Sequence, residues 1–147
     1  SLDDKPDVLA SVLLDLSLGM LRRADARLPA DLPVELVQGD LFDLPFSDGA
    51  FDAVLHFGIP HVLADWAPVA RELGRVVRPG GTIHVGSLVA SGRPVGNAFL
   101  RLLQAAGEVA RPRRVEEVEA TLATLGPVVM EREGSWAFAV VTRSLQQ

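Results

Sequence analysis

Residues 34–89 decide the fold of this chain, and they read VELVQGDLFDLPFSDGAFDAVLHFGIPHVLADWAPVARELGRVVRPGGTIHVGSLV. An apolar strand ends at Gly39, a polar turn follows, and a second strand covers residues 51–55. A helix begins near Ala67, and a third apolar strand covers residues 82–85. Strand, turn, strand, helix and strand in this order predict a parallel α/β sheet.

The end of the helix and the ends of the strands can both be located in this stretch. Residues 78–81, Arg-Pro-Gly-Gly, predict a sharp helix end, because proline cannot continue a helix and glycine tolerates a positive φ. Ligands of parallel α/β sheets bind outside the carboxyl ends of the strands. Asp40 and His56 fall at those ends, and His56 opens the loop after its strand. They are therefore the first candidates for a site.

The flanking segments continue the alternation of strands and helices. Before the deciding stretch, we expect a strand at residues 12–15 and a helix over residues 18–28. After it, we expect an amphipathic helix over residues 97–109 and a second amphipathic helix that ends before Gly126-Pro127. Two strands, 128–132 and 136–142, then follow, joined by a turn. The inward side chains expected for the two helices are Phe99, Leu102, Leu103 and Ala106 in the first, and Val115, Val118, Leu122 and Leu125 in the second.

Four segments of the chain resemble a known family. They are Val37-Gln38-Gly39-Asp40, Leu44-Pro45-Phe46, Phe51-Asp52-Ala53-Val54 and residues 75–81. In order and spacing these segments are similar to class I S-adenosylmethionine-dependent methyltransferases, and within that class to small-molecule enzymes of the UbiE and type-11 kind. Upstream, Leu14-Asp15-Leu16-Ser17 and Gly19-Met20-Leu21 resemble the second strand of the family and the turn after it.

The resemblance implies a Rossmann-like, doubly wound and mostly parallel sheet with a C-terminal antiparallel hairpin, in a single domain over residues 1–147. The family's first strand is followed by a glycine-rich loop, but this chain has no glycine before Gly19. Val8-Leu9-Ala10 fits a strand start, yet the next strand follows at once, and a parallel crossover needs about a dozen residues or more. We therefore expect the domain to be N-terminally incomplete, or to lack a segment between Ala10 and Ser11.

By the same resemblance, Asp15 binds the ribose hydroxyls of the cofactor, while Leu16 and Met20 lie near the adenosine. Asp40 and the Leu41 amide match the adjacent donor and acceptor of adenine. Each acid also has a plainer interpretation. Asp15 or Ser17 precedes a helix and is favoured at its N-cap, and Asp40 follows glycine in a turn. Asp52, at the start of its strand, is expected to cap a turn or pair with a neighbouring element.

Two histidines follow the strand at residues 51–55. The resemblance places His56 against the cofactor and makes His61 a candidate catalytic residue, since a histidine near pKa 6.5 can accept a proton from an acceptor hydroxyl. Packing or capping is the alternative for His61. A metal site at His61 and Asp65 is not expected, because no third ligand is near and Pro60 and Pro68 disturb the helix.

Composition narrows the class of protein further. The 147 residues are 48% hydrophobic and include no cysteine, which excludes disulfides and thiolate chemistry. The net charge of −5 disfavours nucleic-acid binding. The one basic cluster, Arg111, Arg113 and Arg114, is interpreted as a solvated helix start beside glutamates. Neither an export signal nor an apolar run of about 20 residues is visible, so we expect a cytoplasmic protein that does not span a membrane.

The predicted function is S-adenosylmethionine-dependent methyl transfer to a small, neutral or weakly polar acceptor. The acceptor is expected to meet residues 57–66 and 91–99, which are mostly apolar. The alternative is a non-catalytic scaffold of the same fold that binds a partner, and a nucleotide-dependent oxidoreductase is a weaker third reading. A homo-oligomer is compatible with the sequence but not indicated by it.

Overall fold

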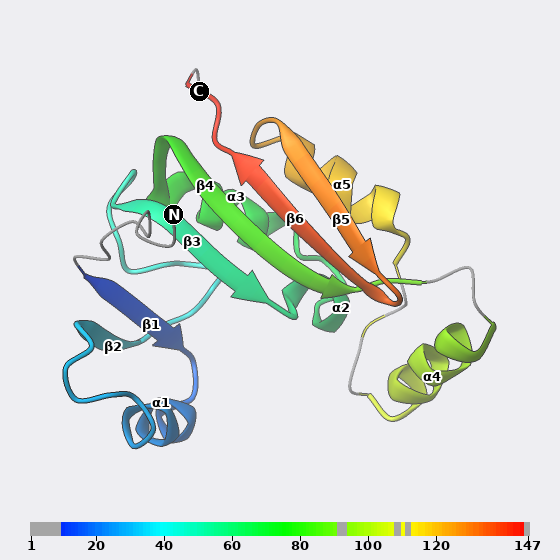
Figure 1. Cartoon of the computed structure of the whole chain (residues 1–147), viewed down its shortest axis with the longest axis horizontal. Helices are drawn as coiled ribbons and strands as arrows, with labels where there is room; N and C mark the ends of the chain where they lie inside the picture. The colour runs from blue at the N-terminus through cyan, green and yellow to red at the C-terminus, as the bar shows by residue number, and fades with distance from the viewer. Residues whose placement is uncertain (1–9, 91–93, 108–109, 111–112, 146–147) are drawn as a thin grey trace, which may run out of the picture. The chain divides into compact units, whose positions relative to one another are not determined.

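The computed structural model describes residues 10–90, 94–107, 110 and 113–145. The chain divides into two compact units, one up to Pro45 and one from Phe46 onward. Figure 1 shows the labelled elements of both. The strand expected at residues 8–10 lies largely outside the described residues.

The first unit is a parallel strand pair with one helix. β1 (Ser11–Asp15) pairs with β2 (Val34–Gln38), so that Asp15 stands beside Gln38 at the carboxyl ends of both strands. Between them, α1 (Leu18–Asp25) begins at Ser17, whose Oγ accepts a hydrogen bond from the Met20 amide. The helix is shorter than the predicted residues 18–28, because the chain passes into turns after Asp25.

The second unit contains a four-stranded sheet in the order β3-β4-β6-β5. Its strands are β3 (Phe51–Phe57), β4 (Val77–Leu88), β5 (Val128–Glu133) and β6 (Trp136–Thr142). β3 and β4 are parallel, and β6 runs antiparallel to both of its neighbours, which confirms the expected C-terminal hairpin. The parallel pairs β1–β2 and β3–β4, together with the antiparallel β6, agree with the expected mostly parallel α/β fold.

Four helices belong to the second unit. They are α2 (Ile59–Val62), α3 (Ala67–Val76), α4 (Pro94–Ala105) and α5 (Val115–Ala123). α3 and α5 lie on one face of the sheet (Figure 1). Their apolar stripes are buried there with the inward residues of β4 and β6, as the helical periodicity predicted. The core consists of Val69, Leu73, Val76, Val118, Leu122, Leu125, Ile83, Val85, Ala137, Ala139 and Val141.

The junction between α3 and β4 differs from the prediction. The helix already ends at Val76, and residues 78–81 form an irregular step inside β4 rather than a helix end. A Cβ on Gly81 would lie 2.6 Å from the Asp52 main-chain oxygen, so only glycine fits where the two strands approach. Arg78 Nε donates to Asp52 Oδ1 over 2.6 Å, which confirms that Asp52 pairs with a neighbouring element.

The inward face predicted for the helix after residue 91 is partly wrong. Leu102 is 66% exposed, whereas Leu100 is buried. Ala106 is exposed because α4 ends one residue earlier, at Ala105. The interpretation assumed a helix over residues 97–109, but α4 begins at Pro94, and the stripe that it buries is different.

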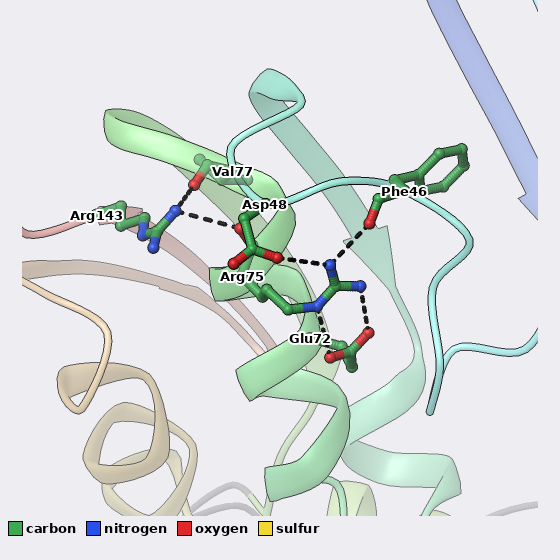
Figure 2. A network of polar contacts seen from close by, with 6 residues as sticks. All are labelled: Phe46, Asp48, Glu72, Arg75, Val77 and Arg143. Atoms are coloured by element: carbon green, nitrogen blue, oxygen red, sulfur yellow. Dashed lines mark hydrogen bonds and ion pairs between the residues drawn. The ribbon is translucent and has the colours of Figure 1, made fainter. Parts of the chain in front are cut away.

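A polar network fixes the turn before β3 to the end of α3 (Figure 2). Arg75 forms a bidentate pair with Glu72, with distances of 2.9 and 2.8 Å, and its Nη1 donates to Asp48 and to the Phe46 main-chain oxygen. The hydrogen bonds that Arg75 donates to the Glu72 and Asp48 carboxylates raise the pKa of Arg75. Arg143 donates from the other side to the Arg75 and Val77 main-chain oxygens, which caps the carboxyl end of α3.

Candidate functional site

Two carboxylates stand at the carboxyl end of the parallel pair in the first unit. Asp15 is the last residue of β1, and Asp40 comes two residues after the end of β2. The Gly39 amide between them donates to the Asp15 main-chain oxygen over 3.2 Å. A Cβ on Gly39 would lie 2.8 Å from the Leu14 side chain and 3.2 Å from the Pro45 ring, so this turn leaves little room for a larger residue.

Each carboxylate also stabilises its own turn. Asp15 Oδ1 accepts a hydrogen bond from the Ser17 amide over 2.7 Å, and Asp40 Oδ1 accepts one from the Phe42 amide over 2.9 Å. The turn role considered for Asp40 is therefore present, whereas the N-cap of α1 is Ser17 and not Asp15. Within the described residues, the second oxygen of each carboxylate has no hydrogen bond, so both acids keep an acceptor for a ligand.

Exposed apolar side chains follow the first of these acids in the chain. Leu16, directly after β1, is 69% exposed, and Met20, in the first turn of α1, is 50% exposed. Leu41 is half-buried beside Asp40. Hydroxyls and an exocyclic amine need acceptors, and a purine needs apolar surface. The first unit provides both kinds of group at one end of its sheet.

His56 does not lie in the loop after the strand, as the sequence had suggested, but inside β3. Side chains alternate along a strand, so His56 shares the face of Val54, which is the half-buried face of β3. Its Nδ1 is buried, and among the described residues it has no hydrogen-bond partner. Burial lowers the pKa of His56 from 6.5 to about 4, so the ring is neutral at physiological pH.

His61 lies on α2, a one-turn helix where the sequence predicted a loop. Its Nδ1 accepts a hydrogen bond from the Leu88 amide over 3.0 Å, with Ser87 Oγ 3.5 Å away. Because Nδ1 is the acceptor, the proton of the neutral ring is on Nε2. Burial also lowers the pKa of His61, and its ring meets Trp136 edge-on at 6.2 Å.

Arg113 is the polar residue whose role the sequence did not indicate. Its interpretation as part of a solvated helix start is wrong, because only 6% of the residue is exposed. The guanidinium donates to the main-chain oxygens of Pro60, Leu63 and Ala64, around the end of α2. Its neighbour Arg114 is exposed at the start of α5, as predicted. No pattern in the sequence distinguishes these two arginines. Arg111 lies outside the described residues.

Neither a metal-binding cluster nor a membrane-spanning helix occurs in the part of the chain that the structure describes. No three His, Asp or Glu side chains there come together in a group that could hold a metal ion. No helix there is long and apolar enough to cross a membrane.

Comparison with known proteins identifies the family. Residues 5–85, more than half of the 147, match the model of a family described as a methyltransferase domain. The chain belongs to this family. It is a member of the class I S-adenosylmethionine-dependent methyltransferases, and the cofactor of that class is S-adenosylmethionine.

Among its relatives are demethylmenaquinone methyltransferases. The chain is 47% identical to that of Mycolicibacterium vanbaalenii over 75 residues, which cover 50% of this chain and 30% of the relative. It is 32% identical to the uncharacterized protein YafE of Escherichia coli over 111 residues, which cover 73% of this chain and 53% of that protein. The chain thus spans between 30% and 53% of the length of these relatives.

Solved structures show the same fold. An O-methyltransferase family protein from Burkholderia thailandensis has a TM-score of 0.78 at 18% identity, covering 95% of this chain and 45% of that one. The YcgJ protein of Bacillus subtilis has a TM-score of 0.69 at 22% identity, covering 84% of this chain and 55% of that one. At these identities the likeness concerns the fold alone.

Proposed function

We propose that this chain carries out methyl transfer from S-adenosylmethionine to a small-molecule acceptor. The observation that carries the proposal is the pair of acids at the carboxyl ends of β1 and β2. Each is oriented by one main-chain amide and keeps a second oxygen for a ligand. Family membership supplies the chemical class of that ligand.

In this proposal, the residues of the first unit hold the cofactor. Asp15 accepts hydrogen bonds from the ribose hydroxyls, and Asp40 accepts one from the adenine amine while the Leu41 amide donates to a ring nitrogen. Leu16 and Met20 cover the adenosine with apolar surface. When bound, the cofactor supplies a methyl group already activated by its sulfonium, so the protein's part is to align the acceptor and exclude water.

The second unit contains two further candidates, His56 and His61. His56 is proposed as a cofactor residue by resemblance, and its ring is neutral at physiological pH because burial lowers its pKa to about 4. His61 remains the catalytic candidate. While the Leu88 amide occupies Nδ1, its Nε2–H can donate to an acceptor oxygen and orient it. The ring could take up a proton only if Nδ1 left that amide.

Substitution of the two acids tests the cofactor site. Asp15→Asn and Asp40→Asn keep an oxygen for the turn but replace the other by an amide, so each should weaken S-adenosylhomocysteine binding by about 1–3 kcal/mol. Asp31→Ala, which removes the charge of an exposed acid in the same unit, is the control. Calorimetric titration measures the three affinities. If all three variants bind like the wild type, the acids have turn roles only.

The acceptor that we propose is small and neutral or weakly polar. Its proposed neighbourhood, residues 57–66, is mostly apolar, with His61 and Asp65 as polar exceptions. The names of the relatives point to quinones of the demethylmenaquinone kind as the first acceptors to try. The net charge of −5 argues against nucleic acid.

Labelling decides the class of acceptor. The protein is incubated with S-adenosylmethionine labelled in the methyl group, first with demethylmenaquinone and then with a metabolite extract, RNA and DNA. We expect label in a small organic-soluble molecule. Label in RNA or DNA with none in small molecules would contradict the proposal.

A further inference from the structure

The short helix α2 needs support from outside. It spans only Ile59–Val62, and one turn of helix is unstable by itself because nucleation costs more than one hydrogen bond returns. Its last carbonyls also have no partners in a following turn. The chain leaves the helix at Leu63 in extended conformation. Whatever satisfies these carbonyls therefore determines where His61 lies.

Arg113 satisfies them. Its Nη1 donates to the Pro60 and Leu63 oxygens, the latter over 2.9 Å, and its Nη2 donates to the Ala64 oxygen. A guanidinium presents its donors in a rigid planar fork, which suits several carbonyls diverging from one helix end. A positive charge at the carboxyl end of a helix is also favourable. Burial of Arg113 strengthens these interactions by excluding water.

The same segment of the chain also holds His61 by its main chain. The Ala110 amide donates to the His61 oxygen over 2.7 Å, and the Ala90 amide donates to the Arg113 oxygen over 2.7 Å. The Leu88 amide fixes the His61 ring. We call Ala110 and Arg113, with these bonds, the α2 clasp. The chain between β4 and α5 contains α4. The clasp joins the two ends of this chain segment, at Ala90 and Arg113, and holds them to α2, which follows the carboxyl end of β3.

We propose that Arg113 is a positioning residue for the methyl acceptor: by clasping α2 it holds His61 and its Nε2–H at the carboxyl edge of the four-stranded sheet. The inference deepens the proposed function and rests on it. Parallel sheets bind ligands at that edge, and α2 and the ends of the α4 connection meet there. Arg113 thus acts on the acceptor through α2, and not on the cofactor site at Asp15 and Asp40.

Three variants test the clasp on the full protein. Arg113→Ala removes the fork, Arg113→Lys keeps the charge without the fork, and Arg114→Ala removes the same charge from the exposed neighbour. The first readout needs no activity. NMR of the His61 ring nitrogens, assigned with His61→Gln, reports which nitrogen carries the proton, and amide exchange is followed at Leu63 and Leu88.

In the wild type and in Arg114→Ala, we expect a single His61 tautomer protonated on Nε2 and slow exchange at both amides. Arg113→Ala should give mixed tautomers and exchange at least about tenfold faster. Arg113→Lys should be intermediate, because a lysine has donors but no fork. Guanidinium added at millimolar concentration should restore the wild-type spectrum of Arg113→Ala. If Arg113→Ala does not fold, Arg113→Lys and its response to guanidinium take its place.

The second readout separates positioning from a general loss of structure. With the acceptor found by labelling, Arg113→Ala should raise the KM for the acceptor at least about tenfold and leave S-adenosylhomocysteine affinity within about twofold. An unchanged His61 spectrum and unchanged exchange in Arg113→Ala would overturn the proposal, as would an equal loss at the cofactor and the acceptor. If no S-adenosylhomocysteine binds even to the wild type, the proposed function fails, while the His61 spectrum still decides whether the clasp exists.

Discussion

At the scale of single residues, the second unit contains a histidine whose charged state is disfavoured. Burial lowers the pKa of His56 to about 4 in the folded protein, against 6.5 for an ordinary histidine. Between these values the unfolded chain binds more protons than the folded one, so stability falls as the pH falls. Above pH 6.5, His56 is neutral in both the folded and the unfolded chain, and its burial no longer lowers the free energy of unfolding.

We therefore expect the free energy of unfolding to fall by about 2 kcal/mol through His56 as the pH is lowered from 6.5 to about 4. Urea unfolding at several pH values measures it. His56→Gln, which cannot be protonated, should show a flatter dependence, with His61 as a remaining contributor because burial lowers its pKa too. Parallel curves for His56→Gln and the wild type would mean that His56 titrates normally.

Residue-level prediction succeeded where a side chain serves its own local segment. Ser17 caps α1 and Asp52 pairs with Arg78, as their positions in the sequence suggested. It failed for Arg113, because the partners of that residue are main-chain oxygens about 50 positions away. Carbonyl groups occur at every residue, so the sequence carries no sign of which ones a buried guanidinium will meet.

At the scale of elements, the turn between α5 and β5 depends on a glycine. A Cβ on Gly126 would lie 2.0 Å from the Thr142 main-chain oxygen and 3.0 Å from the Ser144 amide. Two hydrogen bonds join this turn to the end of β6. The Thr142 amide donates to the Pro127 oxygen, and the Ser144 amide donates to the Leu125 oxygen. Backbone cannot be displaced without breaking these bonds.

Gly126→Ala should therefore lower the free energy of unfolding by about 2–4 kcal/mol, measured by thermal or urea unfolding. Gly19→Ala is the matched control. It lies in α1, its new Cβ would meet nothing closer than 3.7 Å, and alanine favours a helix by about 0.5–1 kcal/mol over glycine. Equal stability of the two variants would show that the turn at Gly126 can relax.

Among the elements, those with a strong apolar period were predicted well. α3 and the strands at residues 128–142 lie within a residue or two of the expected limits. The sequence did not indicate α2, since four residues containing a proline have no helical period and the helix depends on Arg113 for its carbonyls. The Arg-Pro-Gly-Gly segment was wrongly predicted to end the helix. It lies inside β4, because proline and glycine interrupt a strand as readily as they end a helix.

At the scale of the whole molecule, the two units differ in how much structure supports them. Among the residues that the structure describes, the first contains two strands and one helix, and a sheet of two strands is marginal by itself. The second contains four strands with two helices packed on one face. We expect amides of β1 and β2, such as Leu13 and Val37, to exchange with deuterium faster than Ile83 and Val141. Exchange at one common rate would support the single cooperative domain that the sequence suggested.

The fold class was readable from the order of strands and helices, and the identity of the site residues rested on resemblance. Asp15 and Asp40 could be chosen from the sequence because strand ends are local features. The burial of the His56 Nδ1 atom could not be predicted, because the position of a residue in a strand does not show which side chains will cover it.

The central claim is that this chain binds the cofactor of its family and uses it. Calorimetric titration of the full-length protein with S-adenosylhomocysteine, the product of methyl transfer from that cofactor, tests it most directly. We predict saturable one-to-one binding that Asp15→Asn and Asp40→Asn weaken and Asp31→Ala does not. A folded protein that shows no binding at millimolar S-adenosylhomocysteine would contradict the claim and favour a non-catalytic scaffold.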